Sequence, residues 1–421
     1  MTKAAPSPLS FRDYRLFWIA RFSAVMATMA MVVIIAWQVY DVARADYGMT
    51  ERQAALQLGL LGLVQFVPLA LLTPVAGWVA DRFDRRLVAI LANAIDLTVA
   101  LTLGWFTYTD TLTLPVLFAL AAGHGMARVF VGPSMSAMVA NLVPAESLPT
   151  AIAYNSMAWQ IGSVVGPAVG GFLYASNPAL PYWEAAGLLA LASVAVGFIK
   201  PLPITGIKGK AHPLQQMVDG LRYTWRERFL LGAITLDLFA VLLGGATALL
   251  PIYARDILQV GTEGLGVMRA APALGATIMA IWFAFRPLKY NVGTKMLWAV
   301  VIFGLATIGF GLSRNYAFSM AMLAVLGAAD MLSVYVRSSL IQLNTPDQMR
   351  GRVSSVSTLA ISASNELGEM QSGVAAAAFG PVGAVVIGGV GAIMVTGIWA
   401  VIFPELKNAR TFEPQFRDVK T

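Results

Sequence analysis

The chain of 421 residues contains no cysteine and only two histidines, His124 and His212. The absence of cysteine excludes disulfide bonds, thiolate metal sites and cysteine nucleophiles. The sequence also has no G-x-S-x-G, H-E-x-x-H or Walker-type phosphate-binding motif. We therefore expect no enzyme activity, no ATP hydrolysis, no cofactor and no metal site.

Charged residues are scarce as well. They make up 12% of the chain against 58% hydrophobic residues, and the mean hydropathy is +0.70. This leaves too little polar surface for a soluble protein of this length, so the composition predicts an integral membrane protein. The polar first ten residues show no cleavable signal peptide, and we expect the first apolar run to insert directly.

Apolar runs recur along the whole chain. A span of about 30 Å of hydrocarbon needs roughly 20 residues in a helix. Twelve runs of this kind are expected at 16–40, 54–79, 87–107, 114–139, 151–176, 182–200, 229–253, 264–286, 296–313, 316–343, 354–379 and 383–403. An even number of spans places both termini on the same side, and the sequence predicts an all-α polytopic membrane protein.

The positions of the cations predict the side. With the N-terminus inside, the cytoplasmic segments hold 21 Lys and Arg and the external loops only four, namely Arg44, Arg52, Arg255 and Arg314. Cations accumulate on the cytoplasmic side of membrane proteins, so both termini are expected in the cytoplasm. The net charge of +7 is explained in this way, and we expect no nucleic-acid partner.

The longest connection divides the chain. We expect an N-terminal half at 1–199, a linker at 200–228, a C-terminal half at 229–403 and a tail at 404–421. Apolar residues recur in the linker at helical spacing beside arginines, which predicts an amphipathic helix on the cytoplasmic leaflet. These residues are Leu214, Met217, Val218, Leu221 and Trp225. The alternative interpretation is a solvated tether between the halves.

An internal repeat supports two related halves. A shift of 202 positions superimposes, without a gap, Gly125 on Gly327, Pro144 on Pro346, Ala158 on Ala360, Gly166 on Gly368 and Gly171 on Gly373. Related halves predict a binding site between them near the membrane midplane, opened alternately to each side.

A charged segment, GWVADRFDRR from Gly77 to Arg86, separates the second and third runs. It resembles the cytoplasmic loop between helices 2 and 3 of the major facilitator superfamily, of the form G-x-x-x-D-R-x-x-R-R. Gly77 would let two helices approach closely, and Asp81 would face a helix N-terminus or a cation. Asp84 stands where the superfamily usually has glycine, a variant familiar in the branch of the macrolide and enterobactin exporters.

The fifth run carries a second motif, which comprises Gly162, Gly166, Pro167, Gly170 and Gly171. It resembles the G-x-x-x-G-P-x-x-G-G signature of the superfamily's antiporters and favours export. Small residues four apart also indicate close helix packing alone, and proline a kink, without any transport role.

Carboxylates within the predicted spans are expensive and usually face a cavity, pair with a cation or carry protons. Asp237, Glu366 and Glu369 are the first candidates for proton coupling, because no cation on their own helices lies within a turn or two. Asp330 is a further candidate, although Asp330 and Arg337 lie seven apart on one helix face and could stabilise packing as an ion pair with other helices. The possible cationic partners of the buried carboxylates are Arg21, Arg128, Arg269 and Arg337. A low-dielectric cavity favours the neutral form of a carboxyl group, as reversible protonation near neutral pH requires.

Other polar residues in the spans are candidates for the lining of the cavity: Asp96, His124, Arg128, Arg337 and Asn365. His124 and Arg128 share a helix face, but a lone histidine is more often a packed residue than a proton relay. Asp96 could be a buried hydrogen-bond acceptor. Arg21 and Arg269, near the start of their spans, could extend to the headgroups.

The resemblance covers nearly the whole chain. It includes FRDYRLFW at 11–18, the segment from Pro144 to Ala151, and NTPDQMRGR at 344–352. Together with the two motifs, these segments resemble the drug:proton antiporter branch of the major facilitator superfamily. The resemblance implies a cytoplasmic latch formed by Gly77, Asp81, Arg82, Arg85, Arg86, Arg350 and Arg352. The arginine motif of helix 4 in these antiporters is poorly matched, because Gly123 and Gly125 precede Arg128.

We therefore expect a monomeric, proton-coupled exporter of amphipathic small molecules, siderophore-like or drug-like, in the bacterial inner membrane. Its partners would be the substrate, protons and membrane lipids. Two alternatives stay open: an uptake symporter or uniporter of the same fold, and a lipid-moving or sensing membrane protein without net transport.

Overall fold

The computed structural model describes residues 6–202 and 213–412, and within these ranges every regular element is a helix. Within the described ranges, ten helical segments are long and apolar enough to cross a membrane. The predicted all-α membrane fold is confirmed, and all twelve predicted apolar runs coincide with helical segments.

The N-terminal part of the chain begins with a short 3-10 turn and continues in long helices. Their bounds are η1 Pro8–Ser10, α1 Arg12–Ala45, α2 Glu51–Arg82, α3 Arg85–Tyr108, α4 Leu114–Leu142, η2 Ala145–Ser147, α5 Leu148–Ser176 and α6 Leu180–Gly197. Helices α1, α2 and α3 extend a few residues beyond the predicted runs at both ends, and α4 and α5 do so at one end, because polar residues at the termini continue the helix without being apolar. Helix α6 ends three residues before its predicted run.

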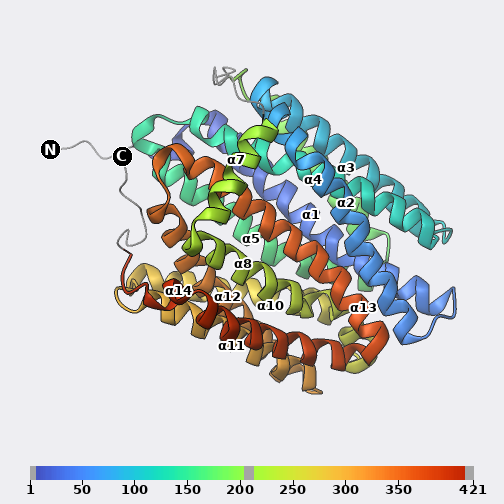
Figure 1. Cartoon of the computed structure of the whole chain (residues 1–421). Helices are drawn as coiled ribbons and strands as arrows, with labels where there is room; N and C mark the ends of the chain where they lie inside the picture. Colours follow the sequence, from blue (N-terminus) through green and yellow to red (C-terminus); the bar gives the residue numbers. More distant parts are fainter. Residues whose placement is uncertain (1–5, 203–212, 413–421) are drawn as a thin grey trace. The chain divides into compact units, whose positions relative to one another are not determined.

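The C-terminal part begins with the linker helix. The bounds are α7 Pro213–Arg226, α8 Arg228–Leu243, η3 Ala246–Leu249, α9 Leu250–Ile252, η4 Tyr253–Ile257, α10 Gly261–Phe285, α11 Val292–Leu312, α12 Tyr316–Asn344, α13 Asp347–Ile402 and α14 Pro404–Asn408. Figure 1 shows α13, in orange and red, beside α8 and α11, with which it makes extensive contacts.

Two predicted spans differ in detail from the structure. The run at 229–253 breaks after α8 at Gly244 and Gly245, and a 3-10 turn, a short α-helical turn and a π-helical turn follow. The break occurs where the backbone approaches α13 closely, since a Cβ atom on Gly245 would lie 2.8 Å from the Gly368 carbonyl oxygen. The run at 151–176 forms α5 but lies outside the ten most apolar segments, because glycines and polar residues lower its hydropathy.

Helix α13 contains the last two predicted spans. Gly380 separates them with φ +77° and ψ 162°, a conformation that residues with a Cβ atom rarely adopt, and Pro381 follows it. The two predicted spans, 354–379 and 383–403, are therefore separated at the point where α13 changes direction.

The chain forms two compact units. Of the described residues, the first comprises 6–46, 64–202 and 260–270, and the second comprises 47–63, 213–259 and 271–412. The beginning of α2 thus groups with the second unit and the beginning of α10 with the first, so the compact units differ from the expected sequence halves at these two helix ends.

Each unit has its own apolar core. In the first unit the fully buried Tyr14 and Phe17 of α1 pack with residues of α4 and α6. The Tyr14 hydroxyl donates to the Ala151 carbonyl oxygen at 2.6 Å, which ties α1 to α5. In the second unit Phe229, Met296 and Leu340 bring α8, α11 and α12 together.

The internal repeat is visible in the helix bounds. Helix α4 covers Leu114–Leu142 and α12 covers Tyr316–Asn344, so both ends are related by the same shift of 202 positions that relates the sequences. Pro144 and Pro346 follow the two helices at equivalent places, which ends both helices because proline cannot continue them.

Candidate functional site

The second unit buries an ion pair between two membrane-spanning helices. An Arg337 guanidinium nitrogen of α12 contacts the Asp237 carboxylate of α8, and the two residues are 3% and 7% exposed. The expectation that no cation holds Asp237 ionised considered only its own helix, and the structure supplies Arg337 from a neighbouring one. Desolvation of a buried pair of this kind offsets much of its attraction, so its presence alone is weak evidence for a contribution to stability.

Asp330 lies next to this pair. It stands seven residues before Arg337 on α12, two turns away on the same face. Among the residues that the structure describes, no hydrogen bond or ion pair ends on the Asp330 carboxylate. Asp330 therefore differs from Asp237 in having no cation bound to it.

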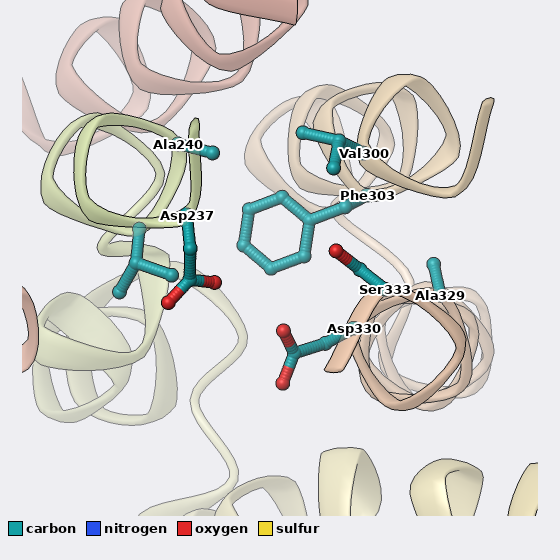
Figure 2. A pocket seen from close by; sticks show the side chains of 8 residues that line it. Asp237, Ala240, Val300, Phe303, Ala329, Asp330 and Ser333 are labelled. Atoms are coloured by element: carbon teal, nitrogen blue, oxygen red, sulfur yellow. The ribbon is translucent and has the colours of Figure 1, made fainter. Parts of the chain in front are cut away.

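A small cavity joins the two aspartates. Its lining comes from α8, α11 and α12 and comprises Asp237, Ala240, Val241, Val300, Phe303, Ala329, Asp330 and Ser333. Figure 2 shows the two carboxylates pointing into the same space, with the Phe303 ring beside them. The cavity has room for roughly one water molecule, and the carboxylates offer such a water its hydrogen-bond partners. A water molecule in this space would be within reach of both carboxylates and could exchange a proton with Asp330.

The two glutamates of α13 lie elsewhere. Glu366 is buried and Glu369 is half-buried, and neither lines the cavity of Asp237 and Asp330. Glu369 borders α2, since a Cβ atom on Gly62 would lie 2.8 Å from the Glu369 Cβ. Asn365 is exposed. The sequence placed four carboxylates together as coupling candidates, and the structure brings together only the two aspartates.

The first unit contains a buried carboxylate and imidazole. His124 Nδ1 on α4 lies 2.6 Å from an Asp96 oxygen on α3, and His124 has no exposed surface. Its Nε2 has no hydrogen-bond partner among the described residues. Asp96 is thus a buried hydrogen-bond acceptor, and His124 is its partner. One turn further along α4, Arg128 donates to Gln65 Oε1 of α2 at 3.2 Å.

The glycine motif of α5 packs closely against neighbouring helices. A Cβ atom on Gly162 would lie 2.9 Å from Val25 Cγ1, and one on Gly166 would lie 3.2 Å from the Ala30 amide nitrogen of α1. Gly170 faces the same helix. Gly171 faces α10 instead, where its Cβ would lie 3.1 Å from Gly266 Cα, and the backbone next to Pro167 borders Gly266 as well. The motif therefore joins α5 to two helices at minimal separation.

The arginines that follow α2 bind within the first unit. Arg85 donates to the Ala137 carbonyl oxygen at 3.0 Å and to Asn141 Oδ1 at 3.2 Å, which fixes the beginning of α3 to α4. Arg86 donates to the Ile199 carbonyl oxygen after α6 and forms an ion pair with Asp84 at 2.8 Å.

Asp84, the residue that departs from the usual glycine, caps α3 by accepting from the Arg86 backbone N–H at 3.0 Å. The side-chain hydrogen bond from Arg86 lowers the pKa of Asp84 against a smaller opposing effect of burial, and the Arg86 backbone N–H and charge lower the pKa further. The carboxylate stays ionised as a helix cap.

The remaining residues of the expected latch are distributed as follows. The side chain of Asp81 lies outside the described residues. Arg82 and Arg350 are exposed, and Arg352 pairs with Asp219 of α7 at 3.3 Å. Among the described residues, a Cβ atom on Gly77 would meet nothing within 4 Å, so the structure does not show the close helix approach expected there.

Three residues of these sites were missed by the sequence reasoning: Gln65, Asp219 and Ser333. Gln65 is a polar residue inside an apolar run, a signal that could have singled it out as it did Asp96. Asp219 lies on the polar side of the linker helix, and Ser333 is one small polar residue among many, so neither carried a distinctive pattern.

Comparisons with known proteins cover almost the whole chain. The family model "Major Facilitator Superfamily" matches residues 17–369. The enterobactin exporter EntS of Shigella flexneri is 25% identical over 416 residues, which are 96% of this chain and 94% of that protein. EntS of Escherichia coli is 24% identical over 412 residues with the same coverage.

Solved transporter structures share the fold. A bacterial homologue of the lysosomal transporter Spinster, inward-facing and occupied, is 15% identical with a TM-score of 0.71, over 94% of this chain and 97% of that one. The nucleoside transporter NupG is 11% identical with a TM-score of 0.74, over 93% of this chain and all of that one. At these identities the similarity describes the fold alone.

Proposed function

We propose a function on the premise that this chain belongs to the Major Facilitator Superfamily, whose model matches most of its length. It is an integral membrane transporter and not an enzyme. The proposal concerns what the chain moves, in which direction and with what energy.

We propose export of amphipathic small molecules, with siderophores of the enterobactin type as the first candidates. EntS proteins, which are similar over 96% of the chain, carry the name of enterobactin exporters. The glycine motif of α5 supports the same direction, because it resembles the antiporter signature and packs α5 tightly against α1 and α10. The protein would lie in the bacterial inner membrane as a monomer with both termini in the cytoplasm.

Proton coupling through Asp330 is the second part of the proposal. The observation that carries it is the unpaired Asp330 carboxylate, which faces a cavity beside the paired Asp237 and Arg337. Asp237, Arg337 and Asp330 form a charge cluster. Arg337 already neutralises Asp237, so protonation of Asp330 changes the net charge of this cluster from minus one to zero. A change of one charge in a low-dielectric site is large enough to favour one conformation over another.

The cycle then follows from the charge of this cluster. Release of the proton into the cytoplasm leaves Asp330 ionised and the substrate binds from the inside. A proton taken up from the outside neutralises Asp330 and favours release of the substrate there, so one proton enters as one substrate leaves. Glu366 and Glu369 remain coupling candidates of the second rank, because they do not line this cavity. We keep the latch of Asp81, Arg82, Arg350 and Arg352 as a proposal for the step that closes the cytoplasmic side.

The test is transport in proteoliposomes with an acidic interior, using enterobactin and a lipophilic cationic dye as substrates. We expect accumulation of one of them only when the pH gradient is present, and protons leaving the lumen with the same dependence on substrate. Equilibration without accumulation would indicate a uniporter, and lipid exchange without substrate movement would indicate a lipid-moving protein. Substrate movement in the direction of the protons would establish a symporter.

Asp330→Asn tests the coupling residue. We expect it to abolish accumulation while substrate exchange between equal concentrations continues, because the variant is fixed in the neutral state. Ser333→Ala changes the same cavity wall without removing a titratable group and should retain accumulation. Undiminished accumulation by Asp330→Asn would exclude Asp330 as the residue that couples transport to protons. The double variant Glu366→Gln, Glu369→Gln would then be the next test.

A further inference from the structure

The linker helix α7 is held against α13 by one of its faces. A Cβ atom on Gly220 would lie 2.8 Å from the Arg352 carbonyl oxygen, and the Arg352 guanidinium donates to Asp219 at 3.3 Å. Thr224, one turn after Gly220, is buried. These contacts fix the rotation of α7 about its axis, so its outward side is defined.

The outward side of α7 carries an apolar stripe. Val218, Leu221 and Trp225 follow at spacings of three and four, which places them on one face, and they are 49%, 51% and 70% exposed. Exposed apolar side chains of this size, three in a row on a short helix, mark an interaction surface.

A basic stripe lies directly beside the apolar one. Arg222 and Arg226 are four residues apart and exposed, and neither forms a hydrogen bond or ion pair among the described residues. Lys200, Lys208, Lys210 and Arg228 add to the charge of the same linker in the sequence. An apolar stripe flanked by arginines is complementary to acyl chains below anionic headgroups.

The position of α7 in the chain places it at a membrane surface. Only Glu227 separates it from α8, which begins a membrane-spanning segment at Arg228. Arg228 donates in turn to Glu405 of α14 at 3.0 Å and to the carbonyl oxygen of Ile402, the last residue of α13, at 2.8 Å. The helix therefore starts from the level at which the chain enters the bilayer.

We propose that α7 is a binding site for the anionic phospholipids of the leaflet at which α8 begins. Val218, Leu221 and Trp225 insert among the upper acyl chains, and Arg222 and Arg226 bind the headgroup phosphates. The Asp219–Arg352 contact connects this site to the beginning of α13. The site does not depend on the substrate or on the direction of transport.

The experiment uses the absence of cysteine from the chain. A single Val218→Cys variant of the full-length protein is labelled with an environment-sensitive fluorophore and placed in nanodiscs, one copy per disc. The discs contain phosphatidylcholine alone or with phosphatidylglycerol, and quenchers are attached to the lipid at headgroup or mid-chain depth. We expect quenching at shallow depth that rises with the fraction of phosphatidylglycerol.

Substitutions separate charge from folding. Arg222→Gln with Arg226→Gln should lower the lipid-dependent quenching on the order of tenfold, because each surface cation contributes to binding of anionic lipid. Arg222→Lys with Arg226→Lys should retain most of it. The matched control is Lys289→Gln with Lys295→Gln, which removes two exposed charges elsewhere in the same unit and should change nothing.

Three results would overturn the proposal. Equal quenching with and without phosphatidylglycerol would show that the charge of the lipid is not recognised. A label that stays in water in every lipid would exclude membrane contact. If the label were shielded from water only in discs that contain several copies, α7 would contact another copy of the chain and not the lipid.

Discussion

At the scale of single residues, the buried pair of Asp237 and Arg337 gives the clearest physical expectation. Removing one partner leaves the other charged and unpaired in a low-dielectric site, whereas removing both leaves no charge to solvate. Asp237→Asn alone should therefore lower the free energy of unfolding by about 3–5 kcal/mol, and the double variant with Arg337→Met by much less.

Thermal unfolding of the purified variants in detergent measures this difference. Asn is close in size to Asp, so the single variant tests charge and not volume. Equal destabilisation by the single and the double variant would mean that the two residues act independently, contrary to the contact in the structure.

Asp84 gives an expectation for pH. Its folded-state pKa is lowered by Arg86, so its contribution to stability is present above the pKa of the unfolded chain, about 4, and is lost as the pH falls through the lower folded value. The effect should be less than about 1 kcal/mol, because a partly solvated ion pair is screened.

Unfolding measured at several pH values on the wild type and on Asp84→Asn isolates this contribution. Asn still caps the helix through its side-chain oxygen, so the two proteins should differ at neutral pH and converge as the solution is acidified. If the difference in the free energy of unfolding grew on acidification instead, the expected stabilisation by ionised Asp84 would be contradicted.

At the scale of helices, glycine matters where two backbones meet and not where the sequence motif alone places it. Gly166→Ala should lower the free energy of unfolding by about 1–3 kcal/mol, since its Cβ would overlap the α1 backbone near Ala30. Gly77→Ala is the matched control, because space is open there and alanine favours the helix by about 0.5–1 kcal/mol. Comparison of the two midpoints of thermal unfolding tests the packing, and similar effects of both would contradict it.

Some features of the fold and of the site could be predicted from the sequence, and others could not. Helix positions and the repeat were predictable, because hydropathy and the shift of 202 positions are properties of contiguous sequence, and α4 and α12 preserve them at both ends. Arg337 was one of four possible partners of the buried carboxylates, but the sequence could not assign it to Asp237, because the two lie a hundred residues apart and only packing brings them together. Gly77 matched a motif, but among the described residues no atom lies within 4 Å of a Cβ placed there, because a local sequence pattern does not specify which backbone packs beside the glycine.

At the scale of the whole molecule, orientation in the membrane decides the direction of export and the leaflet that α7 meets. The distribution of cations, 21 against four, predicts a cytoplasmic N-terminus. Single cysteines in place of the exposed Tyr47, between α1 and α2, and of the exposed Lys289, between α10 and α11, can be labelled selectively because the chain has no other cysteine.

We expect a membrane-impermeant maleimide to label position 47 in intact cells and position 289 only after permeabilisation. Both positions should react fully in permeabilised cells, which controls for accessibility within the fold. The opposite pattern would reverse the topology. Proton release from Asp330 would then face the other compartment, and α7 would lie on the outer leaflet, so the export direction and the lipid site would both need a different assignment.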